Sequence, residues 1–240
     1  MTAFVAEFIG TGTMILLGGG VVANVVLVGT KGHNSGWIVI TAAWAFAVFV
    51  AVTIAGPYSG AHLNCAVTLA NFILGRMDLA TSLSYMTAQL LGAMSGAFLV
   101  WLVYKDHFAK TNDPATKEAV FCTAPAIWNI PVNLFSEVLG TFVLVFTILH
   151  FRDAALNDLT PIGLGSIGAL PVTLLVWAIG LSLGGTTGYA INPARDLGPR
   201  IMHALLPIRN KAPFNSAYAW VPVFGPFLGA SLAALAYMLI

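Results

Sequence analysis

The chain of 240 residues is 58% hydrophobic and only 8% charged, with a formal net charge of +1. This composition is wrong for a soluble globular domain and typical of a protein with several membrane-spanning segments. The weak net charge gives no reason to expect nucleic acid or an acidic partner. Two cysteines, Cys65 and Cys122, form no metal-binding pattern, and their spacing does not require a disulfide.

Six apolar runs are long enough, at about 18 to 25 residues, to cross a bilayer as helices. In chain order we expect these spans at about 4–28, 37–55, 82–104, 131–151, 162–182 and 217–240. The first run is too long for a signal peptide and lacks a basic segment before it, so we interpret it as a retained span. The charged stretch 105–129 is expected to be a connector exposed to water.

Two shorter helical patterns lie between these runs, one after Asn64 and one after Asn192. Asparagine is a favoured N-cap, and Pro193 suits the first helical position because its missing N–H would be unpaired there. The patterns predict short helices over about 65–74 and 193–206. Ten helical residues extend roughly 15 Å, half of the hydrocarbon core, so we expect these helices to span half of the membrane.

The order of long and short helices occurs twice, and the halves also resemble each other in residues. The segment AEFIGT at 6–11 matches SEVLGT at 136–141. We therefore predict a single transmembrane channel domain over 1–240 with internal repeats at about 1–104 and 131–240. Three crossings per repeat is an odd number, so the second copy enters from the opposite side and the broken helices meet at the midplane.

If the two short helices meet cap to cap, their positive dipole ends converge at a central constriction formed by Asn64 and Asn192. Each asparagine can cap its own helix with its side-chain oxygen, which leaves its NH₂ donors free to face a lumen. The preceding segments must be non-helical and line a water-filled cavity. We expect the carbonyls of these segments to form a ladder of acceptors, from Gly60, Ala61, His62, Leu63, Gly188, Tyr189, Ala190 and Ile191. A neutral solute exchanges hydrogen bonds along it, whereas a cation meets two positive helix ends.

Some of the charged side chains within these membrane segments are candidates for function. Arg195 is on the first turn of the second short helix, where a charge is costly unless it faces water, so we expect it at a constriction. The alternative is an arginine that snorkels or pairs with Asp196. Glu7 and Glu137 occupy repeat-related positions, and we expect each to accept hydrogen bonds from a half-helix loop rather than to relay protons.

One Asn-Pro-Ala start is a weak signal, but two such starts at matching places in an inverted repeat are specific. On these residues the chain resembles the aquaporin (major intrinsic protein) family over essentially its whole length. The resemblance implies an all-α membrane fold with six transmembrane helices and two re-entrant half-helices. The NPARD segment at 192–196 fits the family's second signature, whereas Cys65 stands where the first has proline. We expect Cys65 to be a passive substitute; the alternative is a reactive thiol at a helix N-terminus.

Within that family the chain is similar to the glycerol-conducting branch, of which Asp196, Arg200 and Pro222 are typical. That resemblance implies a selectivity filter made by Trp44, Gly180, Tyr189 and Arg195. A polyol could place its CH edge against the aromatic rings while its hydroxyls bond Arg195 and the carbonyl ladder. Tyr189 departs from the usual phenylalanine and makes the filter more polar. The alternative for Trp44 and Tyr189 is an aromatic belt at the lipid interface.

The resemblance thus implies a passive facilitator for glycerol, other small neutral solutes and water that excludes ions and protons. It implies no enzyme activity, cofactor or metal, and a homotetramer in the plasma membrane or bacterial inner membrane. The alternatives are a coupled secondary transporter, or a facilitator mainly for lactic acid, dihydroxyacetone or urea. A structural member of the fold is a further alternative; we find no catalytic motif. Loop charges would place the connector 105–129 in the cytoplasm, but the resemblance implies the reverse.

Overall fold

The computed structural model describes residues 1–156, 160 and 162–240, and six of its helical segments are long and apolar enough to cross a membrane. These segments are α1 (Ala3–Val26), α2 (Trp37–Ser59), α4 (Leu79–Val103), α7 (Ile130–Leu149), η1 with α8 (Gly165–Ala169, Leu170–Ser182), and α10 with α11 (Ser216–Ala219, Val221–Met238). Large apolar side chains such as Phe46, Val103 and Phe135 are exposed on them, as lipid contact requires. The predicted all-α membrane fold is confirmed.

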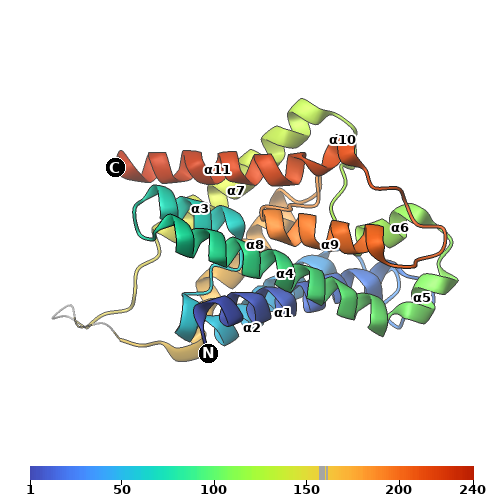
Figure 1. The fold of residues 1–240 in the computed structure, drawn as a ribbon, viewed down its shortest axis with the longest axis horizontal. Coiled ribbons are helices and arrows are strands. Elements are labelled where there is room, and N and C mark those ends of the chain that lie inside the picture. Colours follow the sequence, from blue (N-terminus) through green and yellow to red (C-terminus); the bar gives the residue numbers. More distant parts are fainter. Residues whose placement is uncertain (157–159, 161) are drawn as a thin grey trace.

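Two short helices complete the bundle, α3 (Cys65–Ile73) and α9 (Pro193–Leu205). Their N-caps are Asn64 and Asn192, both in extended conformation. In Figure 1 α3 and α9 extend from the middle of the molecule toward opposite ends of its long axis. Their N-termini therefore face the centre of the bundle, where the peptide dipoles of both helices are positive.

Two predicted spans begin differently from the expectation. The fifth was expected from 162, but it begins as the 3₁₀ turn η1 at Gly165, whose φ of +55° is outside the helical range. The sixth was expected as one helix from 217, but it is divided at Trp220 into α10 and α11. The division follows from Pro222, which has no N–H and whose ring clashes with the carbonyl four residues earlier.

The connector 105–129 is less exposed to water than its composition suggests. It contains the short helices α5 (Lys105–Lys110) and α6 (Pro114–Ala119). Phe108, Phe121, Cys122 and Lys117 are nevertheless buried, and Lys117 Nζ donates to the Arg209 carbonyl at 2.5 Å. The expectation of a solvated connector is therefore wrong for these residues, because their side chains pack onto the bundle around α9.

Glycines bring the long helices into close contact. A Cβ added at Gly92 of α4 would overlap the Phe8 carbonyl of α1, and one at Gly229 of α11 would overlap the Val138 carbonyl of α7. Helices in a membrane gain no hydrophobic free energy by packing together, because lipid tails are as apolar as their side chains. Small residues that allow close van der Waals contact are therefore common where such helices cross. The two crossings hold the frame on which the short helices are mounted.

We predict that Gly92→Ala lowers stability by about 1–3 kcal/mol because the added methyl group forces α1 and α4 apart. The melting temperature in detergent, determined by size-exclusion chromatography of heated samples, measures this loss. Gly20→Ala is the control, since a Cβ at Gly20 meets nothing within 4 Å. Equal melting temperatures for the two variants would show that the α1–α4 contact yields without cost.

Candidate functional site

Each short helix is started by the asparagine that precedes it. Asn64 Oδ1 accepts a hydrogen bond from the Ala66 N–H at 2.8 Å. Asn192 Oδ1 accepts from the N–H groups of Ala194 and Arg195 at 3.1 and 3.3 Å. These bonds satisfy donors that a helix start leaves unpaired, so both helices can begin in the interior of the protein.

The two asparagines also join the halves of the molecule. Asn64 Nδ2 donates to the Ile191 carbonyl at 2.8 Å, and Asn192 Nδ2 donates to the Leu63 carbonyl at the same distance. Each NH₂ group has two N–H donors, of which one is used between the loops. The expectation that all four donors face the lumen is wrong, because each amide lies within reach of the opposite loop.

The loops before the asparagines adopt a strained backbone. Left-handed φ angles between +39° and +83° occur at Gly60, Ala61, Leu63, Gly188, Tyr189 and Ile191. Only glycine adopts this region freely, and each other residue costs roughly 1–2 kcal/mol there. Such a conformation persists only where surrounding contacts over-determine it.

Glu7 supplies those contacts in the first loop. Its Oε1 accepts from the His62 N–H at 2.9 Å and its Oε2 from the Leu63 N–H at 2.7 Å. Ser59 Oγ and Gln89 Nε2 donate to the same carboxylate at 2.6 and 2.8 Å. Glu7 is 0% exposed, so these neutral donors replace the water that its charge would otherwise require.

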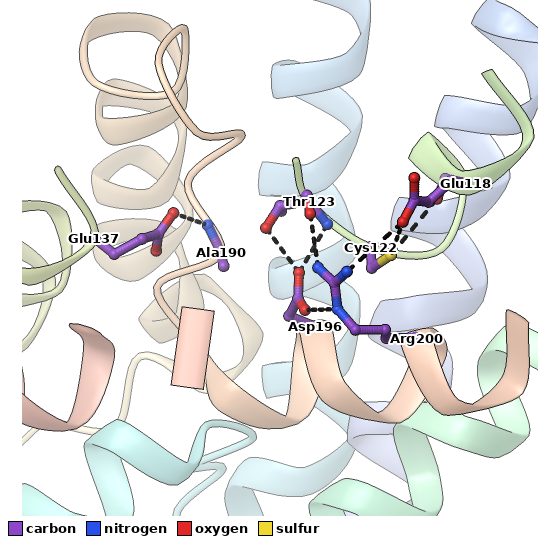
Figure 2. Close-up of polar contacts among 7 residues, drawn as sticks. All are labelled: Glu118, Cys122, Thr123, Glu137, Ala190, Asp196 and Arg200. Carbon is purple, nitrogen blue, oxygen red and sulfur yellow. Dashed lines mark hydrogen bonds and ion pairs between the residues drawn. The ribbon is translucent and has the colours of Figure 1, made fainter. Parts of the chain in front are cut away.

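Glu137 takes the same position in the second loop. Its Oε1 accepts from the Ala190 N–H at 3.0 Å and from Thr187 Oγ1 at 2.7 Å. Its Oε2 accepts from the Ile191 N–H at 2.9 Å. Figure 2 shows the bond from Ala190 to this buried carboxylate. The two glutamates therefore direct loop N–H groups inward to α1 and α7, which turns neighbouring carbonyls the other way.

A cavity of about 350 Å³ is lined by residues of both loops. One part of its wall is polar backbone, from Gly60 to Asn64 and from Tyr189 to Asn192. The other part is aliphatic, formed by Val48, Val52, Val67, Leu144, Ile148, Val172 and Val176. The lining thus combines residues of the two loops with aliphatic side chains of the long helices.

Trp44 and Arg195 line the same cavity and contact each other. The Arg195 Cζ atom lies 4.2 Å from the centroid of the Trp44 ring, a cation–π geometry. Space for this ring comes from Gly18 of α1, where an added Cβ would lie 2.5 Å from the Trp44 ring carbons. The sequence reasoning missed Gly18, because a glycine among three in a row gives no sign of which one faces a tryptophan.

Tyr189 is held on its outer side by a second tryptophan. The Tyr189 and Trp37 rings meet edge to face at 5.9 Å, and Trp37 Nε1 donates to the Gly180 carbonyl at 3.1 Å. The sequence analysis identified Trp37 only as the start of a span. Its spacing from Trp44, two helical turns on the same face of α2, is the signal that could have found it.

Gly180 lies behind Tyr189 and is not among the described residues that line the cavity. A Cβ at this position would be 2.9 Å from Tyr189 Cζ and 3.1 Å from its hydroxyl oxygen. The absent side chain therefore makes room for the Tyr189 ring in the wall. Tyr189 is itself buried, and its hydroxyl has no hydrogen-bond partner among the described residues.

The remaining candidates contribute less. Cys65 is a free thiol and only 6% exposed, so it is shielded from water as a passive replacement for proline would be. Burial raises the pKa of the Cys122 thiol in the connector well above its usual range, which keeps it protonated. In the part of the chain that the structure describes, no three His, Cys, Asp or Glu side chains lie close enough to hold a metal ion.

Comparison with known proteins agrees with this geometry. Residues 1–237 match the family model described as "Major intrinsic protein". A glycerol uptake facilitator protein of Streptococcus pneumoniae is 52% identical over 100% of this chain and 99% of its own length. A probable glycerol uptake facilitator protein of Thermotoga maritima is 49% identical over 99% and 98%. The solved aquaglyceroporin of Plasmodium falciparum is 29% identical, with a TM-score of 0.84 over 98% of this chain and 93% of that one.

We predict that Glu137→Gln destabilises the protein by about 1–3 kcal/mol, because the NH₂ group of glutamine faces one of the three donors and leaves it unpaired. The melting temperature in detergent is the measurement. Asp106→Asn, in the connector helix α5, is the control for removing one negative charge. If the Glu137→Gln variant has the melting temperature of the wild type, the second loop holds its conformation without this carboxylate.

Proposed function

This chain belongs to the major intrinsic protein family, and on that premise we propose that it is a passive channel for glycerol and other small neutral solutes. It is a multi-pass protein of the cell membrane and a channel rather than an enzyme. The names of its relatives support glycerol as the solute, since both describe glycerol uptake facilitators. We further propose that it assembles as a homotetramer in the bilayer, as the family resemblance implies.

The observation that carries the proposal is the mixed lining of the cavity, which joins loop backbone, polar side chains and aliphatic side chains. A polyol has hydroxyls along one edge and CH groups along the other. Carbonyls of the two loops accept hydrogen bonds from the hydroxyls, and the aliphatic side chains of the lining contact the CH groups. A solute of this shape exchanges its water for the wall without losing hydrogen bonds, so its passage needs no input of energy.

Asn64 and Asn192 form the central constriction in this proposal. The amide hydrogens that the opposite loops do not use donate to a passing hydroxyl oxygen. The N-termini of α3 and α9 place positive dipole ends at the same point, which opposes the entry of cations and of protons carried as hydronium.

Trp44, Tyr189 and Arg195 form the selectivity filter, and Gly180 sets its width indirectly. Arg195 donates to solute hydroxyls while its guanidinium rests on the Trp44 face. Gly180 allows the Tyr189 ring to lie back in the wall instead of in the passage. The filter therefore combines one charged donor with aromatic surfaces, which suits a small molecule that is polar on one side.

A coupled transporter is the alternative of another class. It would need a group that takes up a proton or an ion with the solute. No carboxylate is found among the described residues that line the cavity, and Glu7 and Glu137 point their oxygens at backbone donors instead. This arrangement supports a channel that equilibrates its solute.

We predict fast glycerol uptake by proteoliposomes in stopped-flow light scattering, linear in concentration over a broad range and unaffected by a pH gradient. Empty liposomes of the same lipid are the control. Saturating uptake driven by the gradient would overturn the channel in favour of a transporter. Faster permeation of lactic acid, dihydroxyacetone or urea than of glycerol would assign the passage to another solute, and no permeation at all would leave a structural protein.

We also predict that Arg195→Val raises the permeation of polyols larger than glycerol by roughly tenfold, the effect of about 1.4 kcal/mol on the barrier. Loss of the guanidinium widens the filter and removes its charge. Arg76→Val, which alters an arginine lying over the Tyr237 ring instead, is the matched control. Unchanged selectivity in a folded Arg195→Val protein would remove this arginine from the filter.

A further inference from the structure

A third buried carboxylate, Asp196, lies directly after Arg195 and bonds to the connector. Asp196 Oδ2 accepts from the Thr123 N–H and from Thr123 Oγ1, both at 2.7 Å. Asp196 is on α9, whereas Thr123 is 73 residues earlier in the connector. This side chain is 0% exposed, so the pair is a buried tether between two distant segments (Figure 2).

Arg200 completes the tether from one turn further along α9. Its Nε donates to Asp196 Oδ1 at 2.8 Å, and its Nη2 donates to the Thr123 carbonyl at 2.7 Å. Its Nη1 lies 3.7 Å from Glu118 Oε1. Arg200 is only 2% exposed, and a buried cation of this kind requires such partners. Thr123 is therefore held at its N–H, its hydroxyl and its carbonyl.

Thr123 in turn contacts the loop that carries Tyr189. Its Cγ2 and Cβ atoms lie 3.2 and 3.3 Å from where a Cβ would stand on Gly188, a residue with φ of +83°. Three residues further on, the Ala126 N–H donates to the Thr186 carbonyl at 2.9 Å. The connector thus packs on the backbone just before Tyr189, on the loop that Glu137 holds from α7.

We propose that Asp196 is a positioning residue for the selectivity filter, acting through Thr123 on the backbone of Gly188 and Tyr189. The proposal rests on the proposed function as a channel. The second loop is then fixed by two buried carboxylates, directly by Glu137 and through the connector by Asp196. If Thr123 moves, Gly188 loses its support, and the Tyr189 ring gains freedom to move relative to Arg195.

The chemistry requires an acceptor-only side chain at position 196. Three donors converge on it, the Thr123 N–H, the Thr123 hydroxyl and Arg200 Nε. Asparagine offers one oxygen, and its NH₂ group would oppose a donor. In the first half of the chain, the residue four positions after the capping asparagine is Thr68, which bonds within its own half to the Asn64 carbonyl and Gln89. A tether to the connector at this position therefore belongs to the half that carries Arg195.

The test compares Asp196→Asn and Thr123→Val with the wild type in proteoliposomes. Thr123→Val removes the hydroxyl but keeps a methyl group against Gly188, so it separates the tether from the packing. The measured quantity is the permeability to a five-carbon polyol divided by that to glycerol. We expect both variants to raise this ratio by roughly three- to tenfold, the effect of one lost hydrogen bond of about 1 kcal/mol on the filter.

Asp113→Asn is the matched control. Asp113 Oδ2 accepts from the Thr116 N–H at 2.9 Å and from Thr116 Oγ1 at 2.5 Å, the same pattern as Asp196 with Thr123. It lies in the same connector, but it is exposed and its bonds stay within α6. We expect this variant to have the same permeability ratio as the wild type. A rise equal to that of Asp196→Asn would assign the effect to general loosening of the connector and overturn the proposal.

Hydrogen exchange of the amides from 188 to 191, followed by mass spectrometry, gives a readout that does not depend on conduction. We expect faster exchange in Asp196→Asn and Thr123→Val than in the wild type. Unchanged exchange and an unchanged permeability ratio in folded protein would overturn the proposed role of Asp196. If Asp196→Asn does not fold, Thr123→Val alone decides the test. If the wild type conducts no glycerol but exchange is still faster in the variants, the proposed channel function is refuted, and the positioning of the second loop by Asp196 is supported.

Discussion

The structure depends on one constraint: backbone N–H groups of two non-helical loops lie deep in a membrane protein and need acceptors. In the hydrocarbon region each unsatisfied group costs several kcal/mol, so irregular backbone survives only with internal partners. Glu7 and Glu137 provide those partners, because both oxygens of each side chain accept hydrogen bonds from loop N–H groups. With the N–H groups directed at the glutamates, the carbonyls before Asn64 and Asn192 are left for the cavity and for the opposite loop.

The asparagines convert two separate loops into one unit. Each caps its own helix with its oxygen and bonds the other loop with its nitrogen, so neither half-helix can move without the other. Rigid placement matters because the positive ends of α3 and α9 oppose cations only while they face the same point. The close crossings at Gly92 and Gly229 supply a stiff frame for this arrangement.

The two halves of the protein share the same arrangement of helices but differ in the hydrogen bonds around their short helices. In the first, Gln89 and Thr68 extend the network around Glu7 within the membrane helices. In the second, a separate network joins Asp196 and Arg200 to Thr123 in the connector. The second half also carries Tyr189 and Arg195, which line the cavity together with Trp44.

Local chemistry determined much of this protein from the sequence by itself. The length of apolar runs predicts the spans, the asparagines predict where the short helices begin, and glutamates at repeat-related positions in spans indicate buried acceptors. The division of the last span at Trp220 was not expected, although its cause, Pro222 and the carbonyl four residues earlier, is local. Only the tertiary structure decided that Asn64 bonds Ile191, that Tyr189 fills the space at Gly180, and that Thr123 of the connector packs on Gly188. These contacts join residues far apart in the chain, and neither periodicity nor composition records which distant surfaces will meet.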